Sequence, residues 1–311
     1  MVAFSIALFA AILWFGGVES WRALLSGDPW LYFLVFLLTG VAPALSAWRL
    51  RTLVQAATGA GRYPWRRFFH INMTAIALGL FLPRNAALLG GKAAYLRTMG
   101  VPVLRGTWAI LTENLVDLVF LVGIGLPCVL VLVVGLDSTG FIVSFAACYG
   151  LLIVAVLWIR QRDWRAFASR LVHKVPWVSS KLPIPEGGFV PGAVRAVPML
   201  GVTVLIHLFM AARAYAIALA IGVDAPWLVF AAAYPITQLG LVLAVAPGAL
   251  GTLDASWVGL LILGGVTNAD ALSFTLAMRA CIIVFPVIWY GLSVLLSLTI
   301  VPNEALESPL R

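Results

Sequence analysis

The sequence has few charged residues and few of the side chains from which polar catalytic centres are built. Only 10% of its 311 residues are charged, whereas a soluble domain carries roughly 25%. Its three cysteines, Cys128, Cys148 and Cys281, lie apart in apolar runs without metal-ligand spacing, so we interpret them as small hydrophobic side chains. A His-rich metal site, a paired-aspartate metal motif and a Ser/His/Asp triad are missing from the pattern. These shortages exclude a soluble protein and predict a protein that is not an enzyme and has no cofactor.

Apolar residues take the place of the missing charges. Hydrophobic residues make up 63% of the sequence, and the mean hydropathy is +1.06. A run of about 20 apolar residues is long enough to cross a bilayer as a helix. We expect an all-α polytopic membrane protein with six full crossings, at residues 2–18, 29–48, 106–134, 141–159, 198–221 and 271–301. Two further apolar segments, 68–82 and 228–246, end at Pro83 and Pro247 and are each followed by a short second segment.

The charge that is present is mostly positive, with a formal net charge of +8. In a soluble protein this would suggest nucleic acid, but here the Lys and Arg residues gather in two predicted loops, 49–67 and 160–195. Positive loops set membrane orientation and attract anionic lipid headgroups. We therefore expect no nucleic-acid partner, both loops on the cytoplasmic side, and both chain termini cytoplasmic in a cell (inner) membrane.

The two basic loops share one side of the membrane only if residues 68–97 enter and return on that side. The same reasoning makes residues 228–263 a second re-entrant helical hairpin, which enters from the opposite side. The result is one membrane domain, residues 1–311, with inverted halves at about 29–134 and 198–301. Broken helices in inverted repeats are how many transporters build a site near the membrane midplane. Eight ordinary transmembrane helices are the alternative.

Charged residues inside these apolar segments are the candidate functional residues, because charge at membrane depth is costly. Glu113 and Asp117 are four positions apart and share a helix face, which should meet a cavity or a cation. The candidate cations are Arg84, Arg213 and Arg279, and Arg279 is the first choice because it lies in the matching helix of the other half. A buried ion-pair network that only fixes helix packing is the alternative.

The proline breaks place helix N-termini inside the predicted membrane domain. Free backbone N–H groups at such ends favour anions, phosphate included, and Asn85 and Thr252 are predicted N-caps. Asp254 would compete with an anion there, and is a candidate contact for a cationic headgroup or a proton. Plain helix breaking is the alternative. His207, a lone histidine on an apolar helix, is interpreted as a packing residue in preference to a proton relay.

Three motifs occur in order along the chain and cover most of it. Together they resemble the signatures of the lysylphosphatidylglycerol synthase transmembrane-region family, whose members are flippase-like integral membrane proteins. The motifs are Leu82-Pro83 with Gly90-Gly91-Lys92 and Arg97; Glu113-Asn114-Leu115-Val116-Asp117; and Pro247-Gly248-Ala249-Leu250-Gly251-Thr252-Leu253-Asp254 followed by Arg279. Lys92 and Asn114 stand where Arg is usual in the family, and Asp254 stands where Glu is usual.

The resemblance implies lipid transport and not lipid synthesis, since the aminoacyl-transferase domain of the larger members is not in this sequence. Its substrates would be charged-headgroup lipids, such as aminoacyl-phosphatidylglycerol, another phospholipid or an isoprenoid-linked glycolipid. An intramembrane lipid-modifying enzyme and a scaffold for a separate lipid synthase remain alternatives, and a homo-oligomer is possible. The predicted substrate-binding residues are Arg84, Asn85, Lys92, Arg97, Glu113, Asp117, Arg213, Gly248, Gly251, Thr252, Asp254 and Arg279.

Overall fold

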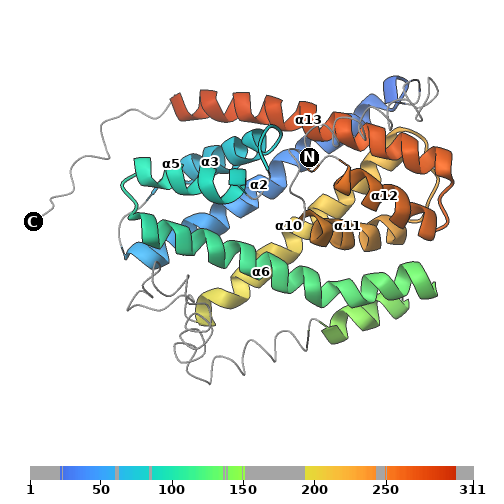
Figure 1. The fold of residues 1–311 in the computed structure, drawn as a ribbon, viewed down its shortest axis with the longest axis horizontal. Coiled ribbons are helices and arrows are strands. Elements are labelled where there is room, and N and C mark those ends of the chain that lie inside the picture. The colour runs from blue at the N-terminus through green and yellow to red at the C-terminus, as the bar shows by residue number, and fades with distance from the viewer. Residues whose placement is uncertain are drawn as a thin grey trace, which may run out of the picture.

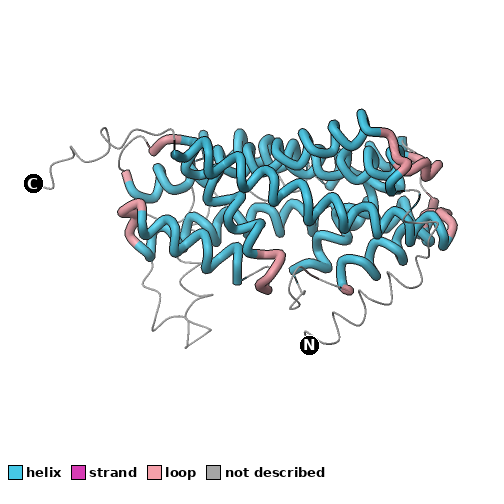
Figure 2. The backbone as a smooth tube through the Cα atoms, turned by 90° about the horizontal axis from the view of Figure 1, so that it is seen from above, coloured by secondary structure: helices cyan, strands magenta, loops and turns pink. Residues whose placement is uncertain are grey.

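The computed structural model describes residues 22, 24–59, 63–83, 86–135, 137, 139–148, 150, 193–242, 249 and 251–298. Within these residues the regular elements are all helices, joined by short loops (Figure 2). Four of the described helical stretches are long and apolar enough to cross a membrane: Pro29–Thr58, Val103–Val134, Pro198–Ala220 and Asn268–Ser297. The expected all-α membrane protein is therefore confirmed, and these four stretches correspond to four of the six expected crossings.

The elements form two series of the same order. The first is α2 (Pro29–Thr58), α3 (Trp65–Leu78), the π-helical turn η1 (Ala87–Gly91) with α5 (Lys92–Thr98), and α6 (Val103–Val129), which continues as the π-helical turn η2 (Leu130–Val134). The second is α10 (Ala193–Ala220), α11 (Trp227–Val242), α12 (Thr252–Leu263) and α13 (Asn268–Leu298). Each series is a long helix, two short helical segments and another long helix.

The packing of the two series also matches. Helices α2 and α10 run in opposite directions across the centre of the molecule and make its most extensive helix contact (Figure 1). Helix α3 packs against α13 of the other series, and its counterpart α11 packs against α6. In Figure 1, α3 and α5 lie on one side of the central pair and α11 and α12 on the other. Each short pair is thus enclosed by long helices from both series.

Helix α2 is longer than the sequence analysis predicted. The expected crossing ended at residue 48 and was followed by a basic loop, but α2 continues to Thr58 and ends at Gly59, whose φ of 66° is left-handed. Glycine adopts this conformation without steric cost, which makes it a common helix terminator. Arg49 therefore lies within a helix and is only 1% exposed. Its assignment to a basic loop was wrong, because acidic partners on α6 hold it inside the protein.

Two hydrophobic clusters support the two series. One cluster lies mainly among the helices α10, α11, α12 and α13 and contains Phe230, Trp257 and Phe274. The other lies mainly among α2, α3, α5 and α6, around Leu50 and Phe68. The expected crossing at residues 2–18 and most of the basic loop at 160–195 lie outside the described residues. The expected crossing at 141–159 is described only in its first half, where a short apolar helix runs from Thr139 to Cys148.

Candidate functional site

Four charged side chains from three helices form a buried ionic cluster. Arg49 of α2 binds Asp117 of α6 with both terminal nitrogens, at 2.5 Å and 2.7 Å, and its Nη2 lies 3.4 Å from Glu113 Oε1. Lys92 of α5 donates to Glu113 Oε2 at 2.8 Å. Two positive and two negative groups are thus paired in one network, in which Lys92, Glu113 and Arg49 are each less than a tenth exposed. We call these four residues the ionic cluster.

Two neutral polar groups add hydrogen bonds to the ionic cluster, in which Arg49 Nε has no hydrogen-bond partner among the described residues. Ser46, one turn before Arg49 on α2, donates to Glu113 Oε1 at 2.5 Å. Arg49 Nη1 also donates to the Thr203 hydroxyl of α10 at 2.7 Å. A buried ion pair is tolerated when further hydrogen bonds satisfy its atoms. The carboxylate of Asp117 is the open side of the cluster, since its side chain is 29% exposed whereas that of Glu113 is 2% exposed.

A second buried ion pair lies in the other series. Arg279 of α13 binds Asp254 of α12 through Nε at 2.6 Å and Nη2 at 2.7 Å. The same Nη2 donates to the Ala249 carbonyl oxygen at 3.1 Å, and Gly251 N donates to Asp254 Oδ2 at 2.9 Å. Ala249 and Gly251 have φ of 51° and 80°, which turns the backbone of the break toward the pair. Asp254 and Arg279 are 1% and 3% exposed.

The two ion pairs occupy matching places with opposite polarity. In the first series a cation in the first turn of the short helix, Lys92, binds an anion on the long helix that follows, Glu113. In the second series the short helix carries the anion, Asp254, and the following long helix carries the cation, Arg279. Each pair therefore fastens one short helix to the long helix of its own series.

The structure confirms the shared face of Glu113 and Asp117 and corrects their partner. Arg279 was the first choice of cation, but its side chain is bound to Asp254, while Arg49 and Lys92 bind the two acids. The sequence analysis missed Arg49 because it placed this residue in a loop. A signal was available, since no glycine or proline lies between Pro43 and Gly59 to end the helix.

The remaining predicted site residues lie outside the two ion pairs or outside the described part of the chain. Arg97 is exposed on α5, and Arg213 is buried on α10 and lies near Cys281 of α13. Thr252 is the first residue of α12 and follows Gly251, so its predicted role as the N-cap is wrong, and its side chain is exposed. Three residues lie outside the described part of the chain: Arg84, Asn85 and Gly248.

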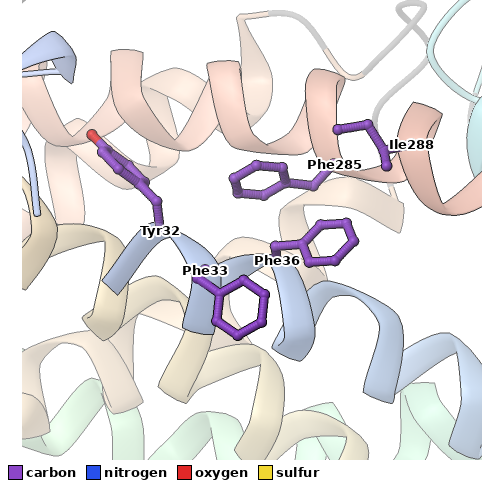
Figure 3. A pocket seen from close by; sticks show the side chains of 5 residues that line it. All are labelled: Tyr32, Phe33, Phe36, Phe285 and Ile288. Atoms are coloured by element: carbon purple, nitrogen blue, oxygen red, sulfur yellow. The ribbon is translucent and has the colours of Figure 1, made fainter. Parts of the chain in front are cut away.

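An apolar groove opens between the first turns of α2 and the middle of α13. Its volume is about 340 Å³, and it is lined by Tyr32, Phe33 and Phe36 of α2 and by Phe285 and Ile288 of α13. Figure 3 shows the two sets of side chains on facing helices. The Tyr32 hydroxyl, the only side-chain polar group of this lining, donates to the Leu24 carbonyl at 2.9 Å. The groove therefore offers an apolar surface to whatever fills it.

The fold and the buried charges define a helical integral membrane protein with paired ionised groups inside its helical bundle. Over residues 2–289 the sequence matches the family described as the lysylphosphatidylglycerol synthase TM region. The chain belongs to this family, which confirms the resemblance of its three motifs. A search of curated proteins found no match.

Proposed function

We propose that this protein is a transporter that moves a charged-headgroup lipid between the two leaflets of a cell (inner) membrane. The proposal rests on two buried ion pairs, Lys92–Glu113 and Asp254–Arg279. They lie at matching places in two series of helices whose first long helices run in opposite directions (Figure 1). Ionised groups at membrane depth are costly and mark substrate pathways. Family membership supports a lipid as the substrate.

A charged headgroup can replace one member of a buried ion pair. A lipid phosphate can take the place of a carboxylate beside Lys92 or Arg49, and an ammonium group can take the place of a cation beside Asp117. Removing one partner of a buried pair without replacement leaves an unpaired charge, which costs about 3–5 kcal/mol. A headgroup that supplies the missing charge avoids this cost. We therefore expect charged headgroups, such as those of aminoacyl-phosphatidylglycerol or phosphatidylglycerol, to be favoured over uncharged lipids.

The lengths of the short helices support the two re-entrant hairpins. Helices α3 and α5 have 14 and 7 residues, and α11 and α12 have 16 and 12, whereas a full crossing needs about 20. The antiparallel packing of α2 on α10 supports an inverted repeat. In this arrangement the segments at residues 59–67 and 160–195 face the cytoplasm, as do both termini, and the two hairpins open toward opposite leaflets.

The groove between α2 and α13 supports an amphiphilic substrate. Both helices are candidate membrane spans, and in the proposed arrangement the groove faces the hydrocarbon region of a bilayer. Phe33 and Ile288 are 53% and 45% exposed, and an acyl chain packed between them would bury apolar surface. We propose that the groove holds one acyl chain while the headgroup enters the polar interior.

The test is lipid movement in proteoliposomes. Fluorescent phosphatidylglycerol, phosphatidylethanolamine and an aminoacylated phosphatidylglycerol are placed in one leaflet, and their appearance in the other is followed by chemical quenching. We expect the protein to move at least one of them at least tenfold faster than empty liposomes, and Glu113→Gln to lose most of this activity. Asp270→Asn is the matched control, because Asp270 is a partly exposed acid at the start of α13 and belongs to neither ion pair.

Three outcomes would overturn the proposal. Equal rates with and without protein for every lipid would exclude transport of these substrates. Recovery of a chemically altered lipid, measured by mass spectrometry, would favour a lipid-modifying enzyme instead. Lipid movement that occurs only after a lipid synthase is added, and not with the protein alone, would favour a scaffold.

A further inference from the structure

A buried histidine lies at the open side of the ionic cluster without a hydrogen-bond partner. His207 of α10 is 8% exposed, and neither of its ring nitrogens has a partner among the described residues. Its Nε2 is 3.8 Å from Asp117 Oδ1, which is longer than a hydrogen bond. Phe120 stacks on the ring with centroids 4.8 Å apart and planes at 12°, and Tyr234 lies 5.9 Å away. The aromatic rings hold the imidazole beside the carboxylate.

His70 of α3 shows what a histidine in a packing role looks like in the same protein. It is also 8% exposed, but its Nδ1 is 2.9 Å from the Ser293 hydroxyl of α13, a hydrogen-bond distance. Tyr290 stacks on its ring and Tyr95 contacts it edge-on. A buried polar group without a partner is costly, and neutral His207 carries that cost whereas His70 does not. The packing role expected of His207 from the sequence does not account for this difference.

We propose that His207 is a proton-binding site, and that the ionic cluster takes up a proton together with a negatively charged lipid headgroup. The inference rests on the transport function proposed above and adds the coupling ion and the sign of the substrate charge. A proton from water binds the free ring nitrogen, and the resulting imidazolium donates a hydrogen bond to Asp117. The same proton returns to water when the site opens on the other side.

The charges around His207 explain why the proton and an anion bind together. With neutral His207 the two cations and two acids of the ionic cluster balance, so a protonated His207 gives the cluster one positive charge in excess. Its Nε2 and Arg49 Nη1 would then share one oxygen, Asp117 Oδ1. Sharing weakens the hold of Arg49 on Asp117 and frees guanidinium donors for a phosphate. A headgroup with one negative charge restores neutrality.

The other ionisable groups on the helices around His207 do not supply this proton site. From α11 the facing group is the Tyr234 hydroxyl, and from α6 and α2 they are Asp117 and Arg49. On α13 the buried charge is Arg279, which is bound to Asp254. Among these side chains, histidine is the one that ordinarily changes its charge between pH 5 and 8.

Linkage makes the coupling reciprocal, because a proton that raises the affinity for an anion is itself bound more tightly when the anion is present. In proteoliposomes we expect wild-type movement of phosphatidylglycerol to be about tenfold faster at pH 6 than at pH 8. His207→Gln, which keeps a polar side chain without a titrating charge, should lose this pH dependence. His70→Gln is the matched control and should keep it. Equal pH dependence in His207→Gln and wild type would overturn the inference.

Proton binding at His207 can also be measured directly, without a transport assay. The chain has three histidines, so a variant with His70→Gln and His173→Gln keeps His207 as its only one. Its imidazole nitrogen NMR signals, recorded in nanodiscs, should titrate between pH 5 and 8, and the midpoint should move to higher pH when phosphatidylglycerol replaces phosphatidylcholine. A ring that stays neutral to pH 5, or a midpoint that ignores the lipid, would overturn the inference. Titration with the expected shift, but no lipid movement by the wild type at any pH, would refute the transport function alone.

Discussion

The buried pair of Asp254 and Arg279 allows a prediction in which the two single substitutions behave differently. Asp254 is 1% exposed and accepts hydrogen bonds from Arg279 and from Gly251 N. Asp254→Asn leaves the guanidinium buried without its anion, and an arginine side chain does not give up its proton in proteins. Arg279→Gln leaves a carboxyl group, which can become neutral by taking up a proton. The penalty of the second change should therefore depend on pH, and that of the first should not.

The magnitudes follow from the burial of both groups. Breaking a buried ion pair from one side costs about 3–5 kcal/mol, which lowers Tm by roughly 5–8 °C for a chain of this size. In Arg279→Gln the folded state holds one proton more than the unfolded state above about pH 4, where a free aspartate is ionised. Its free energy of unfolding should then fall by about 1.4 kcal/mol for each pH unit. The variant with both substitutions leaves no unpaired charge and should therefore be more stable than Asp254→Asn alone.

The assay is unfolding of the purified protein in a mild detergent, by heat and by titration with a denaturing detergent, at pH 5, 6 and 7. Asp270→Asn is the control, because this partly exposed acid at the start of α13 contributes through the helix dipole, about 0.3–1 kcal/mol, and among the described residues its side chain accepts a hydrogen bond only from the nearby Thr267 hydroxyl. Two results would refute the reasoning: Arg279→Gln with a flat pH dependence relative to wild type, or a double variant less stable than both single variants.

Two further predictions concern α2. Arg49→Gln should lower the free energy of unfolding by about 3–5 kcal/mol, because it leaves the buried Glu113 and the partly buried Asp117 with one cation. The exposed Arg97→Gln should change it by less than about 0.5 kcal/mol, and equal values in the same detergent titration would show that the network is not stabilising. Gly40→Ala should cost about 1–3 kcal/mol, because its new Cβ would lie 2.4 Å from the Trp289 ring. Gly201→Ala, which meets nothing within 4 Å, should be neutral or stabilising in thermal unfolding, and a similar loss in both alanine variants would contradict the steric explanation.

Much of the fold could be predicted because membrane helices are encoded locally. The start of α2 at Pro29 is specified by its neighbours: Asp28 accepts a hydrogen bond from Trp30 N as the N-cap, and proline suits the first helical turn. The end of α2 was misplaced by ten residues because Arg49 was taken as a sign of solvent. A charged residue ends an apolar run only if nothing inside the protein neutralises it, and that depends on helices far away in the sequence.

The candidate site was predictable as a set of residues but not as a set of pairs. The four-residue spacing of Glu113 and Asp117 fixes a common helix face, and the structure places both on that face beside Arg49. Which cation meets this face depends on helix packing. The choice of Arg279 assumed that the two series exchange charges with each other. Instead each series forms an ion pair between two of its own neighbouring helices. The paired residues are only 21 and 25 positions apart in the sequence.

In the transport function proposed above, the opposite polarity of the two ion pairs would make the two leaflets inequivalent for a headgroup. If the hairpins open toward opposite sides as proposed, a phosphate entering from one side meets the short-helix cation Lys92, and from the other side it meets the short-helix anion Asp254. The same ligand then has different free energies at the two entrances, although the helical elements follow the same order in both halves. The two entrances of such a transporter would therefore differ in affinity for the same headgroup, while the net direction of movement would be set by the lipid gradient or by a coupled ion.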